Sequence, residues 1–138
     1  METKQAPDCV VIRPNSEYAG KQGFSYFAGI SSETAGSTGI CMHMLAIPPG
    51  GRAKPHLHEA HETAIYVISG EVGMWYGEGL KKYLTMKPGE FLYIPAGMPH
   101  LPANLSATDE AVAVLARTDP NEQESVVLLD LEPPGQVK

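Results

Sequence analysis

The chain has 138 residues and a formal net charge of −6, with 43% hydrophobic and 19% charged residues. This length suits one domain, because two hydrophobic cores would each be marginal. The acidic balance argues against a nucleic-acid partner, since contact with phosphates depends on clustered Lys and Arg. No run approaches the roughly 18 to 20 apolar residues that cross a bilayer, so no membrane partner is expected.

The two ends of the chain carry few structural signals. Charged side chains are scattered through residues 1–20, without the basic start, apolar centre and cleavage site of a secretory signal. Cys9 and Cys41 are therefore expected to be free thiols, and the protein to be cytoplasmic. We divide the chain into an N-terminal segment (1–23) that could join an oligomer interface, a β-barrel domain (24–131) and a flexible tail (132–138).

From residue 24 onward, the sequence predicts short strands and no helices. Runs rich in Ile, Val, Tyr, Phe and Leu are separated by Gly, Pro, Asn and Ser every 8 to 12 residues or so, the spacing of a β-sandwich or barrel. Two packed sheets would accommodate the predicted strands. These are Phe24–Ile30, Ile40–Ile47, Lys54–His58, Thr63–Ser69, Val72–Tyr76, Lys81–Met86, Glu90–Ile94, Ala111–Arg117 and Val126–Leu131.

Three histidines, His56, His58 and His61, lie close together in the sequence. Because alternate residues of a strand point to the same face, His56 and His58 would present two imidazoles side by side. A third ligand would close a metal site, and His100 begins a new strand after the turn at Pro95–Pro99. Since imidazole is the commonest metal ligand, His56, His58 and His100 predict one divalent metal ion.

The same residues resemble two motifs of the cupins, a family of jelly-roll barrels. The first motif is matched by Gly50, His56, His58, Glu62 and Gly70. The second is matched without a gap by Gly89, Pro95, Gly97, His100 and Asn104. The resemblance covers residues 50–104 and implies an all-β fold, the double-stranded β-helix or jelly-roll barrel. It also implies that the glycines shape turns and that Asn104 holds backbone rather than metal.

The resemblance implies Glu62 as the fourth metal ligand, but the spacing leaves His61 as an alternative. Seven residues separate Glu62 from Gly70, one more than in the family motif. A one-residue bulge early in the strand would keep Glu62 facing inward. A regular strand would instead turn His61 inward and Glu62 outward. We favour Glu62, and we expect the other residue to orient a liganding imidazole.

The two ligand sets favour different metals and leave the reaction open. Three histidines with a carboxylate suit Fe, Mn, Ni or Zn, whereas four imidazoles favour Cu, Zn or Mn. Single-domain cupins similar to this chain include dioxygenases and isomerases. The resemblance therefore implies metal-dependent oxidation or isomerisation of a small organic metabolite as substrate, with no catalytic residue assigned. The alternatives are a non-catalytic cupin that binds a small ligand or a structural metal, and a metal-independent sugar epimerase.

The remaining candidates concern the barrel interior and the association of copies. His43 could face the cavity as an acid–base group or face solvent. Arg117 could pair a substrate carboxylate, although the acidic segment Asp119–Glu124 offers a simpler partner at the surface. Exposed sheet edges predict a homodimer. About half of the large soft side chains on the strands should face inward; they are Met42, Met44, Tyr66, Met74, Trp75, Tyr76, Phe91 and Tyr93.

Overall fold

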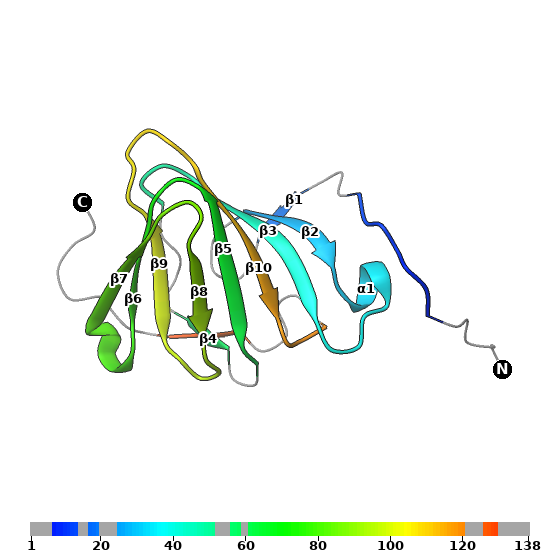
Figure 1. Cartoon of the computed structure of the whole chain (residues 1–138). Helices are drawn as coiled ribbons and strands as arrows, with labels where there is room; N and C mark the ends of the chain where they lie inside the picture. The colour runs from blue at the N-terminus through cyan, green and yellow to red at the C-terminus, as the bar shows by residue number, and fades with distance from the viewer. Residues whose placement is uncertain are drawn as a thin grey trace.

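The computed structural model describes residues 7–13, 17–19, 25–51, 56–58, 61–120 and 126–129, without the side chains of 17–19, 25–28, 56–58, 126 and 127. The predicted tail at 132–138 lies outside the described residues. Two antiparallel sheets face each other as a jelly roll (Figure 1). The expected all-β fold and jelly-roll barrel are therefore confirmed.

Six strands form sheet A, in the order β1-β2-β3-β10-β5-β8. Their bounds are β1 Glu17–Ala19, β2 Ser25–Ile30, β3 Cys41–Ile47, β5 Thr63–Ser69, β8 Phe91–Ile94 and β10 Ala111–Arg117. β10 lies between β3 and β5; it pairs with β3 along its full length and with β5 from Val112 to Arg117. This late strand therefore brings two earlier segments of the chain into one surface.

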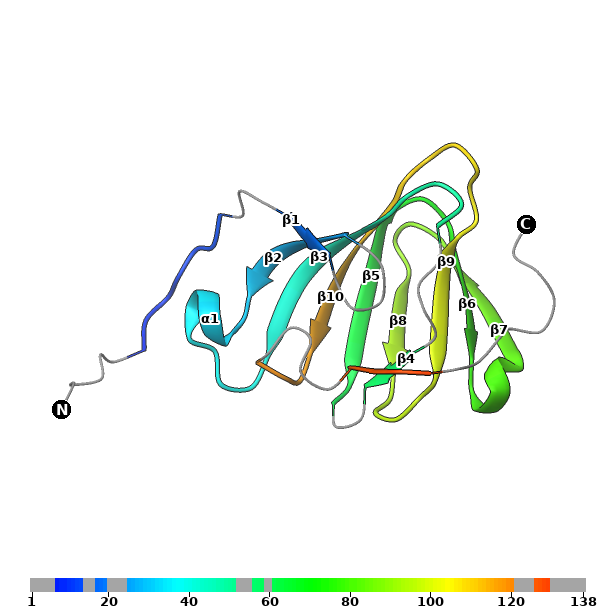
Figure 2. The same ribbon diagram turned by 180° about the vertical axis from the view of Figure 1, so that it is seen from behind.

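Five strands form sheet B, in the order β11-β4-β9-β6-β7. Their bounds are β4 His56–His58, β6 Val72–Tyr76, β7 Lys82–Met86, β9 His100–Asn104 and β11 Val126–Leu128. Sheet A lies toward the viewer in Figure 1, and β4 and β11 come to the front when the molecule is turned (Figure 2). The two predicted histidine motifs thus meet in sheet B.

Each of the nine predicted runs contains a strand, and His100 begins β9 as the turn before it predicts. The strand β1, the helix α1 (Ser32–Ala35) and the 3-10 helix η1 (Glu78–Leu80) have no counterpart among the predicted runs. At the start of α1, the side chains of Ser31 and Thr34 form a reciprocal capping box. Each side chain accepts a hydrogen bond from a backbone N–H group that has no partner within the helix. One turn is too short to show a helical period. No helix in the described part of the chain is long and apolar enough to cross a membrane.

Alternating burial gives sheet A an inner and an outer face. In β10, residues 111, 113, 115 and 117 are buried and those between them are half-buried. The inward residues of both sheets form one apolar core of Leu45, Ile47, Val67, Val72, Met86, Ala111 and Leu115. Beyond this core, toward the Cys41 end of β3, the inner face becomes polar, with His43, Thr63 and Arg117 buried.

The expectation that half of the large soft side chains face inward is wrong. Met74 is buried, and Tyr76 is aligned with His100. Trp75 is also buried, but it packs with Leu80 in a separate cluster on the opposite face of sheet B. The other five are exposed, all on the outer face of sheet A: Met42, Met44, Tyr66, Phe91 and Tyr93. The outer face of sheet A is therefore apolar, as well as much of its inner face.

Candidate metal centre

His100 is the predicted metal ligand whose surroundings are best described. The register places it opposite His56 of β4 on one side and Tyr76 of β6 on the other. Its side chain is buried, and Nδ1 lies 2.8 Å from the carbonyl oxygen of Met98. Because a carbonyl only accepts, Nδ1 carries the proton and Nε2 keeps the lone pair that a metal ion requires.

Burial also keeps the ring of His100 uncharged. It lowers the pKa of His100 from 6.5 to about 4, with the hydrogen bond to Met98 opposing this shift and the charge of Arg117 assisting it. At neutral pH the imidazole is therefore in the deprotonated form that binds metals. The tautomer and the charge of this ring both fit a divalent metal ion.

His56 and His58 stand at the two ends of β4, between β9 and β11. The register pairs residue 56 with His100 and residue 58 with Val126. Directly opposite residues of antiparallel strands have Cβ atoms roughly 4.5 to 5.5 Å apart. The imidazoles of His56 and His58 are outside the described side chains. Among the described ones, no three His, Cys, Asp or Glu side chains gather closely enough to hold a metal ion.

His61 and Glu62, the alternatives for the fourth ligand, differ in burial and in partners. His61 is buried, and its Nδ1 lies 3.1 Å from Asp119 Oδ2. Burial lowers the pKa of His61, and the Asp119 carboxylate opposes this shift. Glu62 is exposed, and its carboxylate accepts a hydrogen bond from the hydroxyl of Tyr93 on the outer face. Its backbone N–H donates to Thr118 Oγ1 at 3.0 Å.

The position of a bulge in β5 accounts for this difference. Along β10, Val112 is opposite Ser69 and Ala113 is opposite Val67, so Ile68 is the extra residue. The bulge lies at the end of β5, whereas an inward Glu62 would require one near the start. Residues 61, 63, 65 and 67 therefore share the inner face, with three of them buried and residue 65 half-buried.

Arg117 is a buried residue of the inner face rather than a surface residue. It is only 4% exposed, although it ends a strand beside an acidic segment. Arg117 continues the buried alternation of β10, and the register places it between Cys41 and Thr63. Arg117 is an even number of residues from Ala111, so the alternation of the two faces along this run is a sequence signal that could have revealed its position.

Arg117 acts electrostatically on all three described buried histidines. In addition to burial, its positive charge lowers the pKa of His43, His61 and His100. For His43, burial is the larger cause, and the two effects together lower its pKa to about 3. His43 thus faces the interior as a neutral imidazole rather than facing solvent. This end of the barrel combines neutral imidazoles with a permanent positive charge.

A family model described as a cupin domain matches residues 43–116. The match spans more than half of the chain, from within β3 to within β10, and it includes both histidine motifs. The chain therefore belongs to the cupin family, and the resemblance seen in residues 50–104 is confirmed.

Several known proteins are similar to this chain. The quercetin 2,3-dioxygenase of Bacillus subtilis (strain 168) is 36% identical over 53 residues, which are 38% of this chain and 15% of that protein. An oxalate oxidase, solved in complex with the substrate analogue glycolate, is 26% identical with a TM-score of 0.66, over 81% of this chain and 60% of that chain. This chain therefore spans less than two thirds of either protein.

A polyketide cyclase from Streptomyces resistomycificus has a more similar length. Its structure is 22% identical with a TM-score of 0.67, over 95% of this chain and 88% of that chain. At this identity, the likeness shows the fold. A single barrel of this size thus exists among solved structures.

Proposed function

We propose that this cupin holds one divalent metal ion at His56, His58 and His100 and uses it to oxidise or isomerise a small organic metabolite. The observation that carries the proposal is the register of β4 with β9, which pairs residue 56 with His100. In addition, Nδ1 of His100 already donates to Met98, as expected of a metal-ligating imidazole. Imidazoles on adjacent strands can reach one metal ion with nitrogen–metal bonds of about 2.0 to 2.2 Å.

For the fourth ligand, we infer His61 in preference to Glu62. His61 is buried with a carboxylate at Nδ1, the partner that commonly orients a metal-bound imidazole. Glu62 is exposed and hydrogen-bonded to Tyr93 on the opposite side. A set of four imidazoles favours copper, zinc or manganese over iron and nickel.

The residues around the site favour an anionic substrate. A metal ion with three or four protein ligands keeps positions for substrate or dioxygen and acts as a Lewis acid. Arg117 adds a permanent positive charge to the interior, which favours a carboxylate or an enolate. Similarity to an oxalate oxidase solved with glycolate supports a small carboxylate. His43, with a pKa of about 3, is a poor proton acceptor at neutral pH, so we propose no acid–base role for it.

Elemental analysis of the untreated protein by inductively coupled plasma mass spectrometry tests the metal site. We expect about one Cu, Zn or Mn per chain, and a metal affinity at least about tenfold lower in His100→Ala. A matched His43→Gln variant, which also removes a buried imidazole, is expected to keep its metal. Full occupancy in folded His100→Ala protein would contradict the ligand set.

Binding and turnover of small carboxylates test the proposed activity. Oxalate and glycolate are titrated into metal-loaded wild type and into Arg117→Gln, and the variant is expected to bind at least about tenfold more weakly. Oxygen uptake with each compound then tests oxidation directly. A metal that does not exchange with added chelators, in a protein that binds neither acid, would favour the non-catalytic alternative.

A further inference from the structure

Thr63, the first residue of β5, is a buried polar residue that the proposed metal site does not use. It is 3% exposed, and its hydroxyl has no hydrogen-bond partner among the described residues. Burying a hydroxyl without a hydrogen bond is unfavourable, so a native structure rarely keeps one unless a ligand or an ordered water completes it. This hydroxyl therefore marks a place where another molecule is bound.

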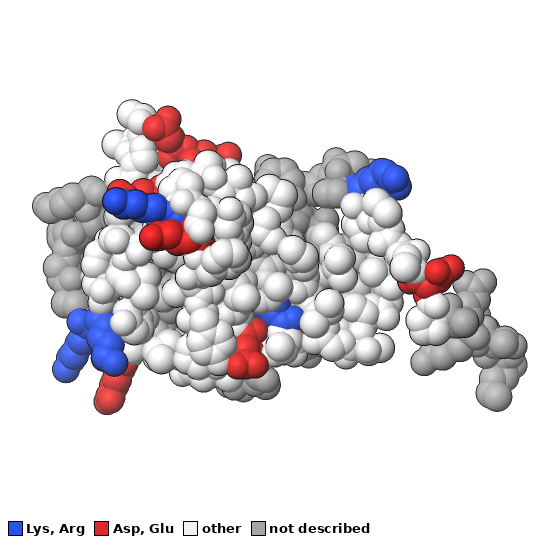
Figure 3. Space-filling view, in the orientation of Figure 1, with Lys and Arg blue, Asp and Glu red and all other residues white. Residues whose placement is uncertain are grey.

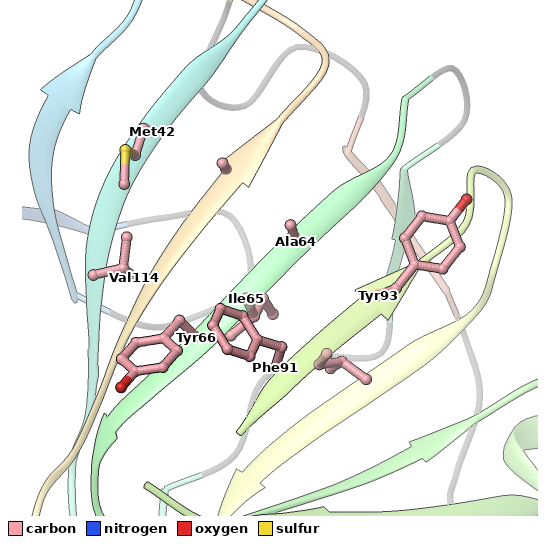
Figure 4. Close-up of a pocket in the computed structure, with 9 residues that line it drawn as sticks. Met42, Ala64, Ile65, Tyr66, Phe91, Tyr93 and Val114 are labelled. Atoms are coloured by element: carbon pink, nitrogen blue, oxygen red, sulfur yellow. The ribbon is translucent and has the colours of Figure 1, made fainter. Parts of the chain in front are cut away.

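The outer face of sheet A offers no anchor for a charged ligand. Over β3, β10 and β5 the surface in Figure 3 is white, and the coloured Lys, Arg, Asp and Glu side chains lie toward its margins. A groove on this face is lined by apolar side chains and tyrosines, with Ala64 and Tyr66 contributed by β5 (Figure 4). Because successive residues of a strand point to opposite faces, Thr63 points away from this groove. It lies on the inner face that it shares with His61.

The neighbours of Thr63 across the sheet are a cation and an apolar side chain. Arg117 of β10 is directly opposite on one side, and the buried Ile94 of β8 is opposite on the other. The Cβ atoms of such pairs are roughly 4.5 to 5.5 Å apart. A guanidinium only donates hydrogen bonds, and a threonine hydroxyl can donate one as well. Two adjacent donors inside the barrel are suited to an anion, which accepts from both.

We propose that Thr63 and Arg117 together bind the carboxylate of the substrate, with the hydroxyl and the guanidinium both donating to it. This inference rests on the proposed function, in which the substrate is a small carboxylate, and adds Thr63 as a residue that determines which acid is bound. A carboxylate has two oxygens and a single charge, which these two residues satisfy. A tetrahedral sulfate or phosphate presents more oxygens and more charge, and it is therefore bound less well.

The position of this carboxylate anchor, Thr63 and Arg117, also limits the length of the substrate. Residues 61 and 63 are two positions apart, so their Cα atoms are separated by at most roughly 7 Å. With His61 as the fourth ligand, the anchor and the metal ion are within the length of one small molecule. A substrate that contacts both is therefore compact, such as a 2-hydroxy or 2-oxo acid whose second oxygen function reaches the metal.

Isothermal titration calorimetry of glycolate with metal-loaded protein tests the role of Thr63. Thr63→Val keeps the size and branching of the side chain but removes the hydroxyl, and it is expected to raise the dissociation constant at least about tenfold. Thr63→Ser retains the hydroxyl and should stay within about threefold of wild type. The matched control, Thr85→Val at an exposed position of β7, should leave the dissociation constant unchanged. The metal content is expected to be the same in all four proteins.

The stability of the ligand-free protein gives a readout that a purely structural threonine would not give. Thr63→Val removes a buried hydroxyl that has no partner in the described residues, so it is expected to raise the melting temperature of chelator-treated protein by about 4 °C. The variant is thus more stable than wild type but binds the acid more weakly. A fall in the melting temperature would overturn the proposal, because the hydroxyl would then stabilise the fold.

The outcomes separate this inference from the proposed function. Metal-loaded wild type and Thr63→Val that bind glycolate equally tightly would overturn the role of Thr63 alone, and the hydroxyl would then hold only an ordered water. A protein without metal would overturn the proposed function, whereas glycolate binding to that protein, weakened at least about tenfold in Thr63→Val, would still support the anchor. No binding of glycolate or oxalate in either form would overturn the inference. So would sulfate that binds more tightly than glycolate and is weakened in Thr63→Val.

Discussion

His43, His61 and His100 are three buried imidazoles whose neighbours differ. His100 donates to a carbonyl, His61 lies beside the carboxylate of Asp119, and His43 is affected mainly by burial. The charge of Arg117 disfavours protonation of all three. Burial is the main cause that lowers the pKa values of these rings, which suits metal ligation for two of them and leaves His43 as a neutral interior residue.

Two substitutions separate the candidates for the fourth ligand. His61→Ala is expected to weaken metal binding at least about tenfold, because it removes a ligand from inside the barrel. Glu62→Ala is expected to change the affinity less than about threefold, since its carboxylate contacts Tyr93 on the outside. Competition with a chromophoric chelator measures both. Equal mild effects would mean that neither residue is a ligand.

His43 makes the stability of the metal-free protein depend on pH. Its pKa is about 3 in the folded state and 6.5 in the unfolded chain, so the unfolded chain binds the extra proton between these values. The stabilisation is complete above pH 6.5 and is lost as the pH falls toward 3. His43→Leu should reduce this slope by up to about 1.4 kcal/mol per pH unit.

Urea denaturation between pH 4 and 7 measures the effect in chelator-treated protein. The other histidines remain in the variant, so the comparison isolates one ring. An unchanged slope in His43→Leu would mean that His43 is protonated as easily in the folded state as in the unfolded chain.

At the scale of the elements, Asn104 fastens the end of β9 to two other segments. Its Nδ2 donates to the carbonyl oxygens of Ile47, Pro48 and Asp109 at 3.0, 3.2 and 2.7 Å. Its Oδ1 accepts from the backbone N–H of Ser106 at 2.9 Å. One buried amide thus holds the end of β3 and the turn after β9, which confirms the backbone role that the resemblance implies.

Removing this amide should destabilise the barrel without removing the metal ligands. Asn104→Ala leaves several buried backbone groups without partners, and we expect a loss of about 3 kcal/mol or more in the free energy of unfolding. Ser106→Ala, which removes hydrogen bonds at an exposed part of the same turn, should cost about 1 kcal/mol. Chemical denaturation compares the two variants, and equal losses would contradict the role given to Asn104.

At the scale of the whole molecule, the proposed ligands come from both sheets. His56, His58 and His100 belong to sheet B, whereas His61 precedes β5 of sheet A. An ion bound by all four would hold the two layers together at the polar end of the barrel. Metal binding and folding should therefore be linked.

The melting temperature reports this linkage. Metal at 100 times its dissociation constant adds about 2.7 kcal/mol to the stability, which raises the melting temperature by roughly 10 °C for a domain of this size. A chelator should reverse the shift, and His100→Ala should abolish it. Differential scanning fluorimetry with Zn or Mn measures the change, and an equal shift in His100→Ala would contradict the proposed site.

The sequence by itself determined the fold class, nearly every strand and the three histidines proposed as ligands. These features depend on local chemistry: alternation along a strand, turns that need Gly or Pro, and two histidines separated by a single residue. The strand β1 and the single-turn helix α1 were beyond such reasoning, because three or four residues are too few to show a period.

Only the tertiary structure decided which side each strand presents. His61 is inside because the bulge in β5 falls at Ile68, and that position is defined by pairing with β10, some forty residues further along the chain. Arg117 is buried, and Phe91 is exposed, because sheet B covers one face of sheet A and leaves the other uncovered. Parity groups the residues of a strand into two faces, but the packing of a second sheet determines which face becomes the interior.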